Sequence, residues 1–169
     1  MSPEQNKAIV ANYLEQAWGK GDWAVAEEVV ADDVVFHDQI REGDLPAGRE
    51  GMREAMRRIS TGLPDFTMDV HELIAEGDFV VIRWSSTGTH NGFFNGFPAT
   101  GRSVTLESIS IVRLKDGRIV EGWQEADQFG AARQLGMLPK GNMPKPMAWL
   151  VVKAIRLKDR LSRRGRAAA

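Results

Sequence analysis

The stretch SVTLESISIVRLKDGRIVEGWQEAD, residues 103–127, decides the fold of this chain. Both halves are rich in β-branched and apolar residues, and the Asp116-Gly117 pair between them is typical of a two-residue β-turn. The stretch therefore predicts an antiparallel hairpin. Regular strands on either side of that turn would be paired as follows: Val112 with Glu121, Ser110 with Trp123, Ser108 with Glu125, and Leu106 with Asp127.

In this register, one face of the hairpin is half polar and half apolar. A tryptophan among serine, leucine and valine makes a poor solvent face, whereas a mixed surface of this kind is typical of a small-molecule pocket. A partly exposed sheet with scattered acids is the alternative. We expect the face to line a pocket, and its members are Leu106, Ser108, Ser110, Val112, Glu121, Trp123, Glu125 and Asp127.

The rest of the chain reads as helices followed by strands, an α+β pattern. Ser2, Pro3 and Gln5 form a capping-box signature for a first helix, and Asp22 caps a second helix over residues 23–30. Further elements are expected at the following positions: a strand at 33–38, a helix at 49–60, a hairpin at 66–90, a short helical turn at 128–136 and a last helix at 147–164.

Composition narrows the classes of function. The chain has 169 residues, enough for one domain with a core, and no cysteine, which excludes disulfides and thiolate nucleophiles. Residues 147–169 carry seven Lys or Arg against one Asp, or +6, so the other 146 residues carry −7. An acidic body argues against nucleic-acid binding. The N-terminus has no basic and apolar leader, so we expect no signal peptide and a cytoplasmic location.

Five motifs resemble one family. They are DDVVFHD at 32–38, PDF at 64–66, AEGDFVVIRW at 75–84, GTHNGFFNGFPATGR at 88–102 and DGRIVEGWQEADQFGAARQLG at 116–136. Together they resemble the SnoaL-like polyketide cyclases, also called ester-cyclase-like. These share a cone fold with nuclear transport factor 2 (NTF2-like) and ketosteroid isomerase. The resemblance implies a curved antiparallel sheet wrapped around N-terminal helices. It covers about residues 5–138, so we expect a domain at 1–139 and a linker with a basic helix at 140–169.

The resemblance also implies an activity. Such enzymes close a ring in a polyketide ester by an aldol-type reaction, without metal or organic cofactor. The aspartate at the end of the W-x-x-x-D strand acts as acid and base, and Asp127 occupies that position here. Glu125 would be its electrostatic neighbour. Because Asp is also a favoured N-cap, Asp127 could instead cap the helical turn that follows.

Other candidate residues have weaker support. Asp38 resembles the general base of ketosteroid isomerases, and His90 could polarise a carbonyl. Asp38 and His37 face opposite sides of a regular strand, so only one of them can enter the pocket. The histidines are not at metal-ligand spacing, so no metal is expected. Further candidates for substrate contact are Trp18, His37, Trp84, Phe93, Phe94, Ser108, Ser110 and Trp123, with the phenylalanines on a glycine-rich lip.

Several alternatives stay open. A non-catalytic binding protein or an assembly module could use the same fold. Limonene epoxide hydrolases also share it. Arg83 and Glu125 resemble two members of their acid–Arg–acid cluster, but Ser85 stands where an aspartate is expected. The basic tail could pack on its own body or a partner subunit, lie on an anionic membrane, or stay partly disordered. We expect a small-molecule substrate and a homo-oligomer, either a dimer or a tetramer.

Overall fold

The computed structural model describes residues 1–37, 45–94, 97–139, 141 and 144–167, and the side chains of 155 and 158–167 are left out. The expected α+β order is confirmed. Along the chain, the elements are α1 (Pro3–Tyr13), η1 (Leu14–Gly19), α2 (Trp23–Val29), β1 (Val30–His37), α3 (Gly48–Gly62), β2 (Thr67–Glu76), β3 (Phe79–Thr89), β4 (Ser103–Lys115), β5 (Arg118–Ala126), α4 (Gln128–Gln134) and α5 (Lys145–Ala167).

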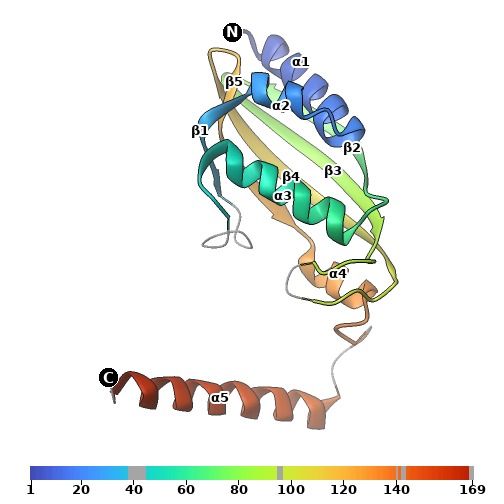
Figure 1. The fold of residues 1–169 in the computed structure, drawn as a ribbon, viewed down its shortest axis with the longest axis vertical. Helices are drawn as coiled ribbons and strands as arrows, with labels where there is room; N and C mark the ends of the chain where they lie inside the picture. The colour runs from blue at the N-terminus through green and yellow to red at the C-terminus, as the bar shows by residue number, and fades with distance from the viewer. Residues whose placement is uncertain (38–44, 95–96, 140, 142–143, 168–169) are drawn as a thin grey trace.

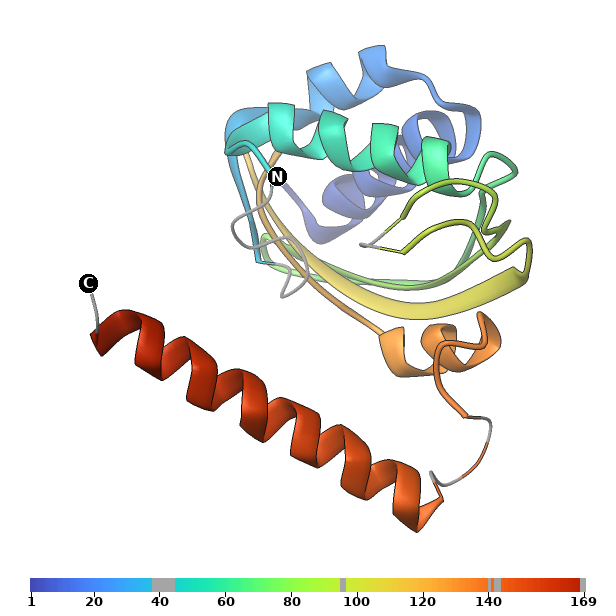
Figure 2. The same cartoon turned by 60° about the horizontal axis from the view of Figure 1, so that its bottom comes forward.

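The five strands form one curved sheet in the order β1-β5-β4-β3-β2. β1 runs parallel to β5, and the remaining neighbours are antiparallel. Helices α1, α2 and α3 cover the concave side of the sheet, and the convex side is turned toward α5 (Figures 1 and 2). This is the expected NTF2-like cone.

The first two helices begin where local sequence chemistry predicts. The Ser2 side chain accepts a hydrogen bond from the Gln5 backbone at 3.2 Å, and the Gln5 side chain accepts one from the Ser2 backbone at 2.8 Å. This reciprocal pair is the predicted capping box. The Asp22 carboxylate accepts from the Ala24 backbone at 3.1 Å and so caps α2, also as predicted.

The end of the first helix was not foreseen. α1 continues into the π-helical segment η1, in which residues five apart lie next to each other along the axis. Trp18 Nε1 consequently donates to the hydroxyl of Tyr13, five residues earlier, at 2.8 Å. This bond fixes the Trp18 indole on the inner side of the fold.

The pairing of β4 with β5 differs from the prediction. Asp116 and Gly117 both have positive φ and make the expected two-residue turn, with Lys115 opposite Arg118. However, Leu114 lies opposite Ile119 while Arg113 lies opposite Glu121, so Val120 is an extra, bulged residue. Beyond it, every pair is shifted by one residue from the regular register.

The shift reverses the faces of β5, because side chains alternate along a strand. Ser110 lies opposite Gln124, and Ile111 lies opposite Trp123. The prediction that Glu121, Trp123, Glu125 and Asp127 share a face with the two serines of β4 is therefore wrong. Gly122, Gln124 and Ala126 occupy the inner face instead.

The hydrophobic core lies between the helices and the base of the sheet. Its most deeply buried members include Val10, Val30, Val80, Leu114 and Ile119, each no more than 2% exposed. They come from α1, β1, β3, β4 and β5, so one core joins the first helix to the whole centre of the sheet. The far end of the cone is left unfilled, and the cavity described below occupies it.

Helix α5 stands away from this body (Figures 1 and 2). The described side chains of α5 are exposed, apart from that of Ala148. Among the described residues, no helix is long and apolar enough to cross a membrane. The division of the chain at residue 139 stays a prediction.

Candidate functional site

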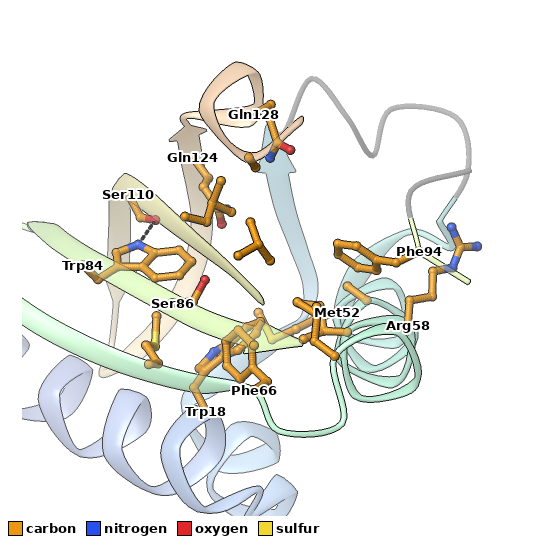
Figure 3. A pocket seen from close by; sticks show the side chains of 18 of the residues that line it. Trp18, Met52, Arg58, Phe66, Trp84, Ser86, Phe94, Ser110, Gln124 and Gln128 are labelled. Carbon is orange, nitrogen blue, oxygen red and sulfur yellow. Dashed lines mark hydrogen bonds between the residues drawn. The ribbon is translucent and has the colours of Figure 1, made fainter. Parts of the chain in front are cut away.

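A cavity of about 860 Å³ lies between the concave face of the sheet and the helices. Its wall contains side chains from every strand and from η1, α3 and α4 (Figure 3). A volume of this size is within the range of ligand pockets, roughly 300–1,000 Å³. The cavity can therefore enclose a compound of several rings.

Aromatic side chains form much of the wall. Trp84 stands on the inner face of β3, and Trp18 and Phe66 lie with their ring centroids 6.4 Å apart. Flat apolar walls of this kind favour flat, conjugated ligands. The aromatic residues along the cavity are Tyr13, Trp18, Phe36, Phe66, Trp84, Phe93, Phe94 and Phe97.

A short row of polar groups crosses the apolar wall. Trp84 Nε1 donates to Ser110 Oγ at 2.9 Å, so the Ser110 hydroxyl hydrogen is available to another acceptor (Figure 3). Gln124 lies opposite Ser110 on β5, and both residues line the cavity. This pair gives the wall neighbouring hydrogen-bond donors at the height of the Trp84 ring.

His90 follows the inner-face residues Trp84 and Ser86, at the mouth end of β3. The side chain is 1% exposed and borders the cavity, and its Nδ1 lies 3.1 Å from Thr100 Oγ1. Backbone bonds from His90 N to Arg102 O, and from Gly101 N to His90 O, hold the residue in place. Nε2 is buried and has no hydrogen-bond partner among the described residues. A buried, half-partnered imidazole beside a cavity is a candidate proton carrier.

Charged residues of α3 also border the cavity. Arg57 donates to the Glu54 carboxylate through Nε at 2.6 Å, and Arg58 donates through Nε at 2.9 Å. These hydrogen bonds, first from Arg57 and then from Arg58, lower the pKa of Glu54 to about 2. Glu54 is therefore a carboxylate held in its charged form, and not a proton donor at neutral pH.

The segment with Phe93 and Phe94 forms a lip of the cavity, since both residues line it. The backbone N–H groups of Asn91 and Gly92 donate to Gly62 O, at the end of α3. Gly62 has no side chain where the Phe94 ring packs, since a Cβ there would lie 2.5 Å from that residue. Phe93 is 67% exposed. The lip is thus anchored on α3 and presents an uncovered aromatic ring to solvent.

Asp127 does not enter the cavity. Its carboxylate accepts a hydrogen bond from the Gly130 backbone at 2.8 Å, which makes it the N-cap of α4. The residue is exposed and lies outside the cavity wall. The arrangement is the capping alternative that the sequence left open.

Three further candidates lie on the outer face. The His37 ring stacks on Trp123, with 5.2 Å between ring centroids, and its Nε2 lies 3.0 Å from Glu121 Oε1. Part of Trp123 borders the cavity, but its ring packs between His37 and Phe79 and therefore lies on the outer face of the sheet. Glu125 is exposed opposite Ile109. Asp38 lies outside the described residues.

The structure separates the members of the epoxide-hydrolase cluster from the cavity. Arg83 points outward and donates to Glu72 at 2.9 Å. That ion pair is exposed, and Glu125 also lies on the outer side. Over the described ranges, no group of three or more His, Asp or Glu residues could hold a metal ion.

Of the predicted contact residues, the cavity wall contains Trp18, Trp84, His90, Phe93, Phe94 and Ser110. Ser108 is buried on the same strand but does not border the cavity. Residues missed by sequence analysis include Ser86, Phe66, Gln124 and Gln128. The alternation from Trp84 to Ser86 could have indicated Ser86, whereas Gln124 becomes visible only once the bulge at Val120 is known.

The fold and site define a class: an NTF2-like cone whose open end holds an apolar cavity with a few polar groups. The sequence model of the SnoaL-like polyketide cyclase family matches residues 8–135. The chain belongs to this family. This match confirms the resemblance to the family that the five sequence motifs indicated.

Individual relatives agree with this assignment. The chain is 37% identical over 73 residues to aklanonic acid methyl ester cyclase DauD of Streptomyces sp. (strain C5). That match covers 41% of this chain and 45% of DauD, so it spans less than half of either protein. Among solved structures, TsrD from Streptomyces laurentii has a TM-score of 0.73 at 28% identity, covering 82% of this chain and 99% of TsrD. IdmH from Streptomyces antibioticus has a TM-score of 0.67 at 33% identity, covering 78% and 99%.

Proposed function

We propose that this protein closes a ring in a largely apolar carbonyl compound of the polyketide-ester type, by proton transfer and without a cofactor. The observation that carries the proposal is His90, a buried imidazole on an apolar cavity with Nε2 unpartnered among the described residues. Family membership and the name of the DauD relative support the class of reaction.

The chemistry follows from the polar groups on the wall. With Nδ1–H donating to Thr100 Oγ1, Nε2 carries a lone pair and can remove a proton alpha to a substrate carbonyl. The Ser110 hydroxyl and the Gln124 amide donate to the enolate oxygen. The enolate carbon then bonds to a second carbonyl carbon, whose oxygen takes the proton back from Nε2. The imidazole ends neutral, so no other reactant is needed.

Two features of the site bear on this route. Nε2 is covered in this structure, so the imidazole or its neighbours must shift when substrate enters. Asp127 is the alternative proton carrier, by resemblance to the family. As an exposed N-cap it would first have to release the Gly130 backbone. We therefore place His90 first.

The test uses aklanonic acid methyl ester, the compound in the relative's name, and follows cyclised product by chromatography. We expect His90→Ala to lower kcat by roughly 100-fold or more, the usual contribution of a general acid–base. Asp127→Asn should keep most of the activity. The opposite pattern, with Asp127→Asn inactive and His90→Ala active, would contradict the assignment to His90.

A non-catalytic binding protein is the second candidate. Of the described residues along the cavity, Glu54 alone carries a carboxylate, and two arginines hold it in its charged form. The binding hypothesis predicts a cavity of this kind, without a carboxylate placed for proton transfer. Native mass spectrometry of the purified protein distinguishes the two: a ligand recovered chemically unchanged after long incubation favours binding.

A further inference from the structure

Helix α5 has an unusual distribution of apolar side chains. Trp149 is 74% exposed and Leu150 is 66% exposed, and Met147, Val151 and Val152 are each more than 40% exposed. At 100° per residue, Met147, Leu150, Val151 and the exposed Leu157 fall within about 120° of one another, and Lys145, Lys153 and Arg156 fall on the other side of the helix. The helix therefore has one apolar face and one basic face, and it stands clear of the body (Figure 2).

The charge of the same segment is nearly all of one sign. Residues 145–169 contain eight Lys or Arg and one Asp, a net charge of +7, whereas residues 1–144 contain 14 basic and 22 acidic residues, a net charge of −8. Lys145, Lys153 and Arg156 are exposed and have no ion-pair partner among the described residues. Lys153 and Arg156 are three residues apart, a spacing at which like charges destabilise an isolated helix.

These two features together point to one kind of partner. A helix docked on protein keeps a solvent face, which ordinarily mixes acids with bases. A helix that is apolar on one face and basic on the other suits an anionic bilayer surface, where tryptophan lies at the headgroup level and each cation is attracted to acidic lipids. Lys145 and Lys153 bracket the apolar turns and can extend their ammonium groups to the headgroups.

We propose that α5 is a membrane-docking helix that lies in the interface of an anionic bilayer. Met147, Leu150, Val151 and Leu157 enter the acyl boundary, Trp149 lies at the headgroup level, and Lys153 and Arg156 bind lipid phosphates. The proposal is independent of the reaction in the cavity.

The test is co-sedimentation of the full chain with vesicles of phosphatidylcholine alone or mixed with phosphatidylserine. We expect binding only to the mixed vesicles, and weaker binding as salt is added. Lys153→Gln with Arg156→Gln should weaken binding at least about ten-fold, since each cation near such a surface contributes roughly five-fold. Leu150→Glu with Val151→Glu should abolish it, because charged side chains cannot enter the acyl boundary.

The matched control is Lys115→Gln with Arg118→Gln, which removes the same charge from the exposed β4–β5 turn and should leave binding unchanged. Because the chain has no cysteine, Leu150→Cys can also carry an environment-sensitive dye, whose emission should shift to the blue with mixed vesicles only.

Equal binding to phosphatidylcholine vesicles, or no binding to either type, would overturn the proposal. So would equal losses in the α5 and control variants. The protein could fail to bind mixed vesicles and yet form an oligomer in sedimentation velocity, with Leu150→Glu dissociating that oligomer. In that case the partner of α5 is a second copy of this chain.

Discussion

The two faces of strand β4 contrast with the usual pattern of a globular sheet. On the inner face, Ser108 is 4% exposed and Ser110 is 9% exposed; on the outer face, Ile109 is 51% exposed and Ile111 is 38% exposed. Serines are therefore buried and isoleucines lie outside, although apolar side chains ordinarily face the core. Ser110 borders the cavity, so this part of the inner face serves a cavity with a polar group in its wall and not a fully packed core. The outer face carries exposed apolar surface of the kind that a second subunit covers. The homo-oligomer expected from the sequence stays a prediction.

The inner face should be the less tolerant of change, and Gly122→Ala gives the largest expected loss of stability. A Cβ at Gly122 would lie 2.6 Å from the Phe36 ring, because these residues pair across β1 and β5. Overpacking of this kind costs about 1–3 kcal/mol. Urea unfolding measures it. The double variant Gly122→Ala with Phe36→Leu should recover part of the loss, and no recovery would show that the ring is not the obstacle.

Ser110 and Ser108 provide a matched pair on one face. Ser110→Ala leaves the buried indole N–H of Trp84 without its acceptor, which costs about 1–3 kcal/mol. Ser108 Oγ is buried with no partner among the described residues, so Ser108→Ala removes an unsatisfied hydroxyl and should be neutral or stabilising. Thermal unfolding of both variants checks this. Equal losses would contradict the different roles of the two hydroxyls.

Asp127→Ala tests the cap of α4 at the end of the same hairpin. Losing the bond to Gly130 N should cost about 0.5–2 kcal/mol, whereas Asp127→Asn keeps a capping side chain and should cost less. Chemical unfolding compares the two. A large loss for Asp127→Asn would mean that the negative charge, and not the cap, is what the site requires.

The smallest effect is expected on the outer face, from Glu121→Gln. Hydrogen bonds from His37, then Arg113, hold the pKa of Glu121 below its usual value. A lowered folded-state pKa contributes stability above the unfolded pKa, and that contribution is lost as pH falls through the folded pKa. The difference in Tm between the wild type and Glu121→Gln should therefore shrink from neutral to acid pH.

Glu125→Gln is the matched control for that experiment. It removes one charge from the same face and strand, where Glu125 makes no ion pair among the described residues. If both variants showed the same pH dependence, the contacts of Glu121 with His37 and Arg113 would not be its cause.

The sequence predicted those parts of the fold that local chemistry determines. The caps at Ser2 and Asp22 and the turn at Asp116-Gly117 depend on a few neighbouring residues, and all three were placed correctly. The cavity residue Trp84 also followed from alternation along its own strand, which needs no knowledge of the partner strand. Ser110 does line the cavity, but the register that assigned it there was wrong, since Ser110 lies opposite Gln124 and not Trp123.

The errors arose where the answer depends on distant contacts. The bulge at Val120 depends on how β5 pairs with both β1 and β4, and neither the turn residues nor the alternation along the strand predicts it. Because the prediction did not include this extra residue, it assigned Glu121, Trp123 and Glu125 to the inner face, whereas they lie on the outer face. Similarly, nothing in the helical spacing of α1 indicates that η1 brings Tyr13 to Trp18.

Because Val120 is an extra residue in β5, we expect the strand to tolerate its loss. Ile119 points inward before it and Glu121 points outward after it, so deleting Val120 would join two positions that already alternate. A relative that lacks this residue would keep its own counterparts of Gly122 and Gln124 on the cavity wall, although each would stand one position nearer to the turn. Equivalent wall residues in two such chains are thus found by aligning on the packing of Phe36 against Gly122, and not by counting from the Asp-Gly turn. The cavity can in this way be inherited unchanged while the hairpin beyond it lengthens or shortens.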